Sequence, residues 1–223
     1  MARFCTEKWD IKSSTNYDTL TMHLTNYAVN KDNQNYKEGD GEHGVGGSKR
    51  SLKCILDSMA ADRVDTTKLM ADIEELIVKS LIAVQPELSH QYRTSQPSDI
   101  DGDMCFELLG YDIYIDAKCR PWLLEANLAP SFQTDEEIDY NLKYHLIKDM
   151  FRVLNATHKE RLRKQNRKKQ EMERRILERT KDKQARVLER VETKVPESEF
   201  KQIYPVPNSD PKYERYAEYL LTS

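Results

Sequence analysis

The chain contains 223 residues, of which 38% are hydrophobic and 33% are charged, and its formal net charge is −3. It has no apolar run near the ~18 residues that a membrane span needs, and the charged side chains from Glu7 to Lys12 interrupt the apolar core that a signal peptide would require. Four cysteines at irregular spacing, without a C-x-x-C pair, favour reduced thiols over a disulfide framework or a zinc site.

The charges are unevenly distributed along the chain. Residues 159–194 contain 15 Lys and Arg against 7 Asp and Glu, a balance of +8, which leaves −11 for the rest of the chain. This asymmetry predicts a basic arm attached to an acidic body.

The first part of the chain predicts a strand, a loop and two helices. Residues Ala2–Thr6 have the pattern of a short strand with no turn or cap before it, so we expect the chain to be part of something longer. Residues 30–49 form a polar loop whose five glycines favour mobility. We expect Ser48 to cap a helix with apolar residues at helical spacing. A second helix is expected over residues 66–84, ended by Pro86.

The second half of the chain predicts two further helices and a tail. Apolar residues spaced by four predict a helix over residues 136–154. Residues 157–194 contain no Gly or Pro and predict a long basic helix with a thin apolar stripe, which needs a surface or a partner. Residues 196–223 contain several prolines and predict a loop with one short helix near residues 213–221.

Between these helices, residues 104–127 change to a strand pattern and predict a β-hairpin. Residues 104–116 and 121–127 are rich in β-branched and aromatic side chains, and residues 117–120 separate them as a four-residue turn. This turn pairs Asp116 with Pro121 and fixes the register of the pairs farther from it.

The predicted register brings three oxygen-bearing side chains to one face of the hairpin. Asp112 pairs with Glu125, Gly110 pairs with Asn127, and alternation puts Glu125 and Asn127 on the same face. Opposed carboxylates repel each other unless a positive charge lies between them, and hard oxygen ligands suit Mg²⁺. The alternative is a solvated polar face. We favour the metal because residues 122–124 and the opposite strand are apolar, so we expect the sheet to be buried.

Five motifs occur in order along the chain: RFCTEKW (3–9), MHLTNYAVNK (22–31), GSKRSL (47–52), CFELLGYDIYID (105–116) and PWLLEANLAPSF (121–132). Together they resemble the tubulin tyrosine ligase-like family, whose members are ATP-grasp amino-acid ligases. The resemblance covers about residues 1–156 and is strongest to the glutamylases. It implies an α+β fold: the C-terminal part of an ATP-grasp domain over residues 1–156, a long basic α-helical extension over residues 157–195 and a tail over residues 196–223.

The resemblance also implies roles for single residues. Asp112, Glu125 and Asn127 match the family's magnesium ligands, in agreement with the register of the hairpin. The remaining matches are Thr25 and Asn26 at the nucleotide phosphates, Tyr27 and Ala28 in the amino-acid pocket, and Arg3, Lys49 and Lys143 as basic residues that hold the free amino acid or the acceptor carboxylate. Arg3 and Lys49 are the candidate catalytic residues. Without the surrounding motifs, these cations would be ordinary surface charges.

The implied chemistry needs no covalent enzyme nucleophile, and no Ser-His or Cys-His arrangement stands out in the sequence. ATP phosphorylates a carboxylate of the acceptor, and the amine of free L-glutamate attacks the resulting acyl phosphate to form an isopeptide branch. Such catalysis depends on positioning and on charge neutralisation around the transferred phosphoryl group. The implied cofactors are therefore ATP and Mg²⁺.

Two features depart from the family pattern. The family's N-terminal half, which supplies the adenine pocket, has no counterpart in these residues, so we expect the chain alone to bind ATP poorly. It would then be a fragment, a product of an incorrectly assigned gene start or a truncated isoform. In addition, Leu128 follows Asn127 where chain-elongating glutamylases tend to have His. This difference leaves open whether the full enzyme starts branches, extends them or uses another amino acid.

The basic segment 159–194 favours an acidic protein partner over other classes of partner. It has no Trp, Tyr or Phe, which argues against membrane insertion and base stacking, and its apolar residues are too sparse for a stable coiled coil. Acidic tubulin tails remain as the expected partner, with no nucleic acid and no membrane. A solvated charged face is the alternative for the segment. A catalytically inactive microtubule-binding fragment is the alternative for the chain. We expect a monomer in the cytoplasm on the cytoskeleton, including the cilium or basal body.

Replacing Arg167, Lys168 and Lys169 with Glu is expected to abolish co-sedimentation with microtubules at low salt, because the attraction to acidic tails is mainly Coulombic. Co-sedimentation of the variant and the parent protein over a series of salt concentrations checks this. Equal sedimentation of the two proteins at low salt would contradict a docking role for the segment.

Overall fold

The computed structural model describes residues 1–9, 17–97, 99, 105–154, 162, 165, 166, 169, 170 and 198–204. The chain divides into two compact units. The first unit contains Met1–Ile73 and Leu108–His145, and the second contains Glu74–Glu107 and Leu146–Ser223. Most of the predicted basic helix and of the C-terminal tail, including the short helix near residues 213–221, lies outside the described residues.

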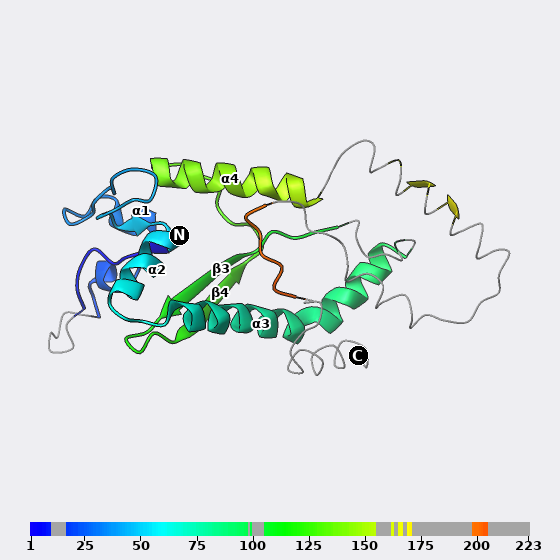
Figure 1. The fold of residues 1–223 in the computed structure, drawn as a ribbon, viewed down its shortest axis with the longest axis horizontal. Coiled ribbons are helices and arrows are strands. Elements are labelled where there is room, and N and C mark those ends of the chain that lie inside the picture. Colours follow the sequence, from blue (N-terminus) through cyan, green and yellow to red (C-terminus); the bar gives the residue numbers. More distant parts are fainter. Residues whose placement is uncertain are drawn as a thin grey trace. The chain divides into compact units, whose positions relative to one another are not determined.

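The described chain contains both helices and short antiparallel strands (Figure 1), which is consistent with the predicted α+β class. The strands are β1 (Ala2–Arg3), β2 (Lys49–Arg50), β3 (Gly110–Ile115) and β4 (Pro121–Asn127). The helices are the 3-10 turn η1 (Leu20–Met22), α1 (Tyr27–Asn30), α2 (Leu52–Ala61), α3 (Thr66–Ser95) and α4 (Glu137–Leu154). The predicted boundaries of α4 are confirmed to within one residue. No helix in the described ranges is long and apolar enough to cross a membrane.

Strands β1 and β2 form a two-stranded antiparallel sheet from distant parts of the sequence. Ala2 pairs with Arg50 and Arg3 pairs with Lys49. The N–H of Phe4 extends the pairing by donating to the carbonyl oxygen of Ser48 at 2.9 Å. The predicted strand over Ala2–Thr6 is therefore shorter than expected, because its partner strand is only two residues long.

The glycine-rich loop before β2 is folded closely on itself. Asp40 and Val45 exchange both backbone hydrogen bonds, at 3.0 and 3.1 Å. Gly44 has a φ of +63°, and a Cβ atom there would lie 2.5 Å from the carbonyl oxygen of Lys49 and 2.9 Å from Cδ1 of Ile138. Only glycine avoids both the backbone strain and the clash. Gly44 thus lets the loop pack against β2 and the start of α4.

The N-cap of α2 is Ser51, and the prediction that Ser48 caps this helix was wrong. The side chain of Ser51 accepts a hydrogen bond from the N–H of Cys54 at 3.1 Å, with the extended backbone that a cap requires. Ser48 lies before β2, and its hydroxyl oxygen accepts from the N–H of Lys37. The two residues of β2 therefore displace the helix start by one turn relative to the prediction.

Helix α3 continues beyond Pro86, so the predicted end at this residue was also wrong. A proline inside a helix removes one N–H donor and clashes with the preceding turn, which usually bends the helix. The ribbon of α3 changes direction in its second half (Figure 1). Pro86 is exposed, so water can bond to the carbonyl group that loses its partner.

The hairpin of β3 and β4 has the predicted register at one end and a different register at the other. Gly110 pairs with Asn127 and Asp112 pairs with Glu125, as predicted. A register shift after Asp112 leaves Leu124 unpaired, so that Pro121 pairs with Ile115 and not with Asp116.

Because of this shift, Asp116 belongs to the turn of the hairpin. Its side chain accepts hydrogen bonds from the backbone N–H groups of Lys118 and Arg120 and from the indole N–H of Trp122, at 2.8 to 3.1 Å. The N–H of Arg120 holds the pKa of the Asp116 carboxyl well below its usual range, and the Arg120 guanidinium acts in the same direction. Cys119 adopts a φ of +57° at this turn.

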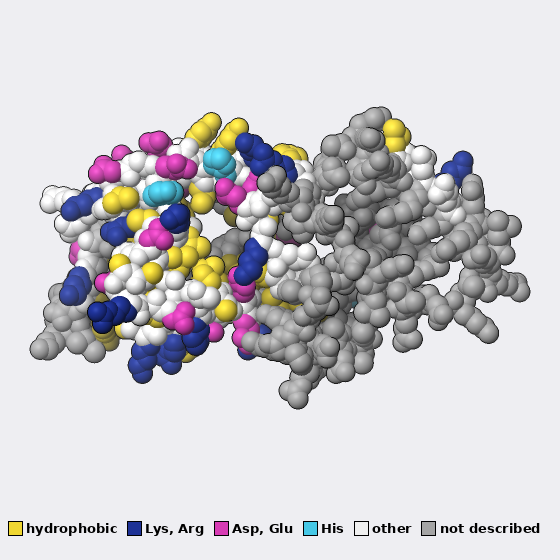
Figure 2. Space-filling view, viewed as in Figure 1, with side chains coloured by type: hydrophobic (Ala, Val, Ile, Leu, Met, Phe, Trp, Pro, Cys, Tyr) yellow, Lys and Arg dark blue, Asp and Glu magenta, His cyan; other side chains and the backbone are white. Residues whose placement is uncertain are grey.

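The expectation that the hairpin is buried was wrong for the described structure. Leu124 is 67% exposed, and Tyr114, Trp122 and Leu128 are also exposed. Hydrophobic side chains lie among the charged ones on the face of the molecule seen in Figure 2. Among the described residues, Leu69 and Ile138 in the first unit and Val78 in the second are the buried hydrophobic side chains.

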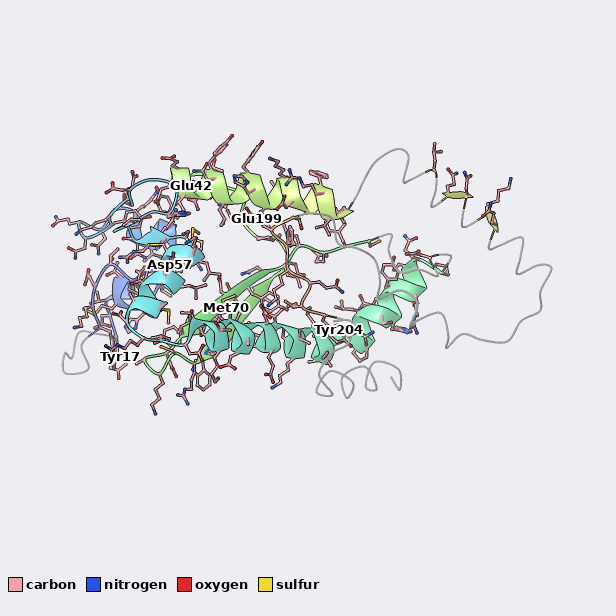
Figure 3. The ribbon with its side chains drawn as sticks, in the orientation of Figure 1. Tyr17, Glu42, Asp57, Met70, Glu199 and Tyr204 are labelled. Atoms are coloured by element: carbon pink, nitrogen blue, oxygen red, sulfur yellow. The ribbon has the colours of Figure 1, made fainter. Side chains whose placement is uncertain are left out.

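In the second unit, residues 198–204 bond to the parts of α3 and α4 that the structure describes there. The N–H of Glu199 donates to the carboxylate of Asp149 on α4 at 2.7 Å, and Lys201 forms an ion pair with Glu74 on α3 at 2.5 Å. Glu199 and Tyr204 mark this segment in Figure 3. The carboxylate of Asp149 is buried, so its bond to the chain compensates part of the loss of hydration.

Replacing Asp116 with Asn is expected to lower the free energy of unfolding at pH 7, and less so in acid. A carboxyl whose pKa is depressed in the folded state stabilises the fold above its unfolded pKa of about 3.9, and this contribution is lost as the pH falls through the folded pKa. Urea unfolding of both proteins at pH 7 and pH 3 measures the difference. Asp135→Asn, at an exposed carboxylate, is the control. A difference that does not depend on pH would contradict this role.

Candidate active site

The face of the hairpin away from its turn gathers two carboxylates, an amide and a guanidinium. Asp112 and Glu125 are direct cross-strand partners, and the amide N–H of Asn127 donates to Oε1 of Glu125 at 3.1 Å. Nη2 of Arg3 donates to Oδ1 of Asp112 at 3.1 Å. The structure therefore brings together the predicted metal ligands and one predicted catalytic cation.

The donor set of this face fits a magnesium ion. The side chains of Asp112, Glu125 and Asn127 offer carboxylate and amide oxygens, which are hard ligands of the kind that Mg²⁺ prefers. Because Asn127 uses its amide N–H toward Glu125, its amide oxygen is left as an acceptor for a cation. Among the described residues, no group of three or more His, Cys, Asp or Glu is placed to hold a metal ion, so a third ligand beside Asp112 and Glu125 would have to be another oxygen, such as that of the Asn127 amide.

The ion pair of Arg3 and Asp112 lies at the surface of the first unit. The two side chains are 32% and 36% exposed, so water screens their attraction. Such a pair contributes about 0–1 kcal/mol to stability and is easily exchanged for another partner. The guanidinium of Arg3 is therefore available to an anionic ligand at this end of the hairpin.

The side chain of Lys49 lies in a different environment. It is buried, and its ammonium group forms ion pairs with Asp139 at 2.7 Å and with Glu136 at 2.9 Å. Burial alone lowers the pKa of Lys49, but the hydrogen bonds to the two carboxylates outweigh it and the pKa is raised. The ammonium also lies 4.2 Å from the centre of the Tyr27 ring. Lys49 is therefore charged at neutral pH and held on several sides.

Two further side chains complete the surroundings of Lys49. The hydroxyl of Tyr36 donates to Glu136, and burial together with this bond raises the pKa of Tyr36 far above its usual value. The ring of Tyr36 packs edge-on against Tyr27, with 5.7 Å between centroids. Lys143 lies 3.7 Å from Asp139 and donates to the carbonyl oxygen of Gln133. Tyr27 and Lys143, both predicted to bind substrate, thus lie beside Lys49.

The predicted nucleotide-binding residues Thr25 and Asn26 lie at the start of α1, and Ala28 lies exposed in its first turn. The buried side chain of Asn30 holds this segment in place. Its amide N–H groups donate to the carbonyl oxygens of Leu24 at 2.7 Å and of Asn26 at 3.0 Å, and its oxygen accepts from the hydroxyl of Thr6 at 2.8 Å.

Sequence reasoning missed Asn30, Tyr36, Glu136 and Asp139. Tyr36 and Asn30 lie in polar segments that look like loop, and Glu136 and Asp139 look like the acidic first turn of a helix. One signal was present for Asp139. It follows Ile138, so a buried position at 138 puts a carboxylate next to the core, where charges are rarely left unpaired. Nothing local in the sequence identifies Lys49 as its partner, 90 residues away.

Comparison with known proteins gives one family and a consistent set of relatives. A family model described as "Tubulin-tyrosine ligase family" matches residues 1–164. A probable beta-tubulin polyglutamylase of Tetrahymena thermophila is 40% identical over 174 residues, which are 78% of this chain and 15% of that protein. The tubulin polyglutamylase TTLL7 of Mus musculus is 43% identical over 157 residues, 70% of this chain and 17% of that protein.

A third relative, the tubulin polyglutamylase ttll6 of Danio rerio, is 40% identical over 155 residues, 70% of this chain and 19% of that protein. The chain thus spans less than a fifth of the length of each of these curated relatives.

Replacing Asn30 with Ala is expected to reduce the free energy of unfolding by about 1–3 kcal/mol, because it removes a buried amide that bonds to the carbonyl oxygen of Leu24 and to the hydroxyl of Thr6. Asn35→Ala, at an exposed amide, is the matched control and should change it by less than about 0.5 kcal/mol. Chemical denaturation of the three proteins gives both values. Equal effects of the two substitutions would show that Asn30 does not hold the segment.

Proposed function

Because the chain belongs to the tubulin-tyrosine ligase family, we propose that it is part of an ATP-dependent ligase that adds glutamate to glutamate side chains of tubulin tails. Relatives whose names describe tubulin polyglutamylases, at about 40% identity, support the choice of glutamate and tubulin. On this proposal, residues 1–156 form the C-terminal part of an ATP-grasp domain, and the basic residues 157–195 form a helical extension that docks on the acidic polymer.

The face of the hairpin carries this proposal. Asp112, Glu125 and Asn127 would hold Mg²⁺, which when bound would neutralise negative charge on the phosphates of ATP. Pairing in the sheet fixes the separation of these side chains before any ligand arrives. Preorganised groups of this kind lower the barrier of phosphoryl transfer, because they need no rearrangement during the reaction.

Arg3 is the cation best placed to bind an anionic substrate group at this face. Its guanidinium is partly exposed and presents several N–H donors in a planar fork, which matches the geometry of a carboxylate. Exchange of Asp112 for the carboxylate of free glutamate keeps the charge of Arg3 balanced. We assign to Arg3 the role of orienting the amino acid whose amine attacks the acyl phosphate.

The remaining predicted residues are assigned by their positions. Thr25 and Asn26, held by Asn30, would contact the nucleotide phosphates at the start of α1. Ala28 and the ring of Tyr27 would line the amino-acid pocket, and Lys143 at the edge of the buried carboxylates would face the acceptor.

Replacing Glu125 with Gln is expected to reduce glutamate incorporation into tubulin by at least about 100-fold, because the metal site loses a charged ligand that is needed in the transition state. The measurement is incorporation of labelled glutamate into microtubules by the full-length protein that contains residues 1–223. Glu107→Gln, at an exposed carboxylate outside the site, is the matched control.

Two results would contradict the proposed function. Full incorporation of glutamate by the Glu125→Gln variant would show that the proposed metal site of the hairpin is not needed for the reaction. No incorporation by the parent protein, together with binding to microtubules, would instead favour an inactive microtubule-binding protein.

A further inference from the structure

We propose that Lys49 is a positioning residue, and that the Lys49 cluster (Lys49, Glu136, Asp139 and Tyr36) fixes strand β2 and thereby places Arg3 beside Asp112. This inference rests on the proposed function, in which Arg3 orients the amino acid. It assigns roles to three residues that sequence reasoning did not identify. It also changes the expected role of Lys49, which the family resemblance put in contact with a substrate carboxylate.

The surroundings of the Lys49 ammonium leave little room for a substrate. An ammonium group has three N–H donors. Two of them point to carboxylate oxygens at 2.7 and 2.9 Å, and the face of the Tyr27 ring lies on a further side at 4.2 Å. The residue is only 5% exposed. A substrate carboxylate would have to displace two buried anions that already compensate the charge of Lys49.

The partners of Lys49 are themselves held in place. Asp139 is 2% exposed and has Lys143 at 3.7 Å as a second cation, while Glu136 accepts the hydroxyl of Tyr36. Between them in the sequence, Ile138 packs against Gly44 in the loop before β2. A buried network in which each charge has a partner is rigid, and removal of one partner leaves an uncompensated charge.

The backbone connects this cluster to the hairpin. Lys49 is the cross-strand partner of Arg3, and β1 is held to β2 by only two residue pairs and the adjacent bond from Phe4 to Ser48. The guanidinium of Arg50 also lies over the ring of Phe4 at 4.6 Å. Because β1 is paired with β2 through the backbone, the position of β2 sets where the guanidinium of Arg3 reaches Asp112, 3.1 Å away.

The decisive experiment compares removal of the cation alone with removal of the whole charge network, in the full-length protein that contains residues 1–223. Lys49→Met removes the cation that Glu136 and Asp139 share and leaves them with only the Tyr36 hydroxyl and Lys143 at 3.7 Å, which should shift β2 and lower kcat/KM for glutamate by about 100-fold, as expected for a misplacement of about 1 Å. The triple variant Lys49→Met/Glu136→Gln/Asp139→Asn has no buried charge to compensate and should recover most of this loss. Lys53→Met, in an exposed ion pair on α2, is the control.

If Lys49 contacts the substrate, the triple variant still lacks the ammonium group and stays as inactive as Lys49→Met, which would overturn the proposal. If Lys49→Met does not fold, the activity of the triple variant alone decides whether Lys49 positions β2 or contacts the substrate. Activity near that of the parent protein supports the proposal, and lost activity in a folded triple variant contradicts it.

A second comparison tests whether Lys49 acts through Arg3. In an Arg3→Ala background, Lys49→Met should raise the KM for glutamate little further, because the residue that it positions is already absent. Independent effects of the two substitutions on KM would mean that Lys49 acts by another route, and would overturn the proposal.

Hydrogen exchange provides a readout that does not need the reaction. Lys49→Met should speed exchange at the amides of residues 2–4 and 49–50, with little change at the control variant Lys53→Met. Unchanged exchange in β1 and β2 would contradict the positioning role. A parent protein that incorporates no glutamate would contradict the proposed function, and exchange would still decide whether the Lys49 cluster fixes these strands.

Discussion

The first unit depends on one buried cation and the two carboxylates that compensate it. An unpaired ammonium group in the interior would be strongly unfavourable, so Lys49 can be buried only where Glu136 and Asp139 reach it. This requirement joins the strand before α2 to the first turn of α4, although they are far apart in the sequence. The glycine-rich loop also packs against α4, because the absence of a side chain at Gly44 lets Ile138 approach the loop.

On the proposed function, the hairpin offers the metal ligands and the Lys49 cluster holds the strand that carries their neighbouring cation. Alternation along β3 and β4 puts Asp112, Glu125 and Asn127 on one face, and Arg3 arrives beside them from β1. The buried ion pairs contrast with the exposed pair of Arg3 and Asp112. The buried cation has fixed partners, whereas the exposed one can exchange its partner for a ligand. The structure thus contains a buried cation with fixed partners and a partly exposed cation whose ion pair is screened by water.

Local patterns in the sequence were enough to predict the local parts of the structure. The apolar period gave the bounds of α4. The pairing of Asp112 with Glu125 was predicted correctly although the predicted turn was one residue too short, because the unpaired Leu124 offsets the extra turn residue. The cap of α2 was not predicted, because the pairing of β2 decides where this helix begins. The continuation of α3 beyond Pro86 was not predicted either, because it depends on the exposure of the proline. The Lys49 cluster could not be predicted, since its contacts depend on how distant segments pack.

The unpaired Leu124 divides the hairpin into two segments with separate registers. Between Asp112 and Asn127 the register sets which side chains meet at the site, whereas the pairs near the turn belong to a different register. Sequence changes in the turn can therefore be accommodated without altering the pairs of Gly110 with Asn127 and of Asp112 with Glu125. The bulge thus separates the register of the proposed ligands from the register of the turn.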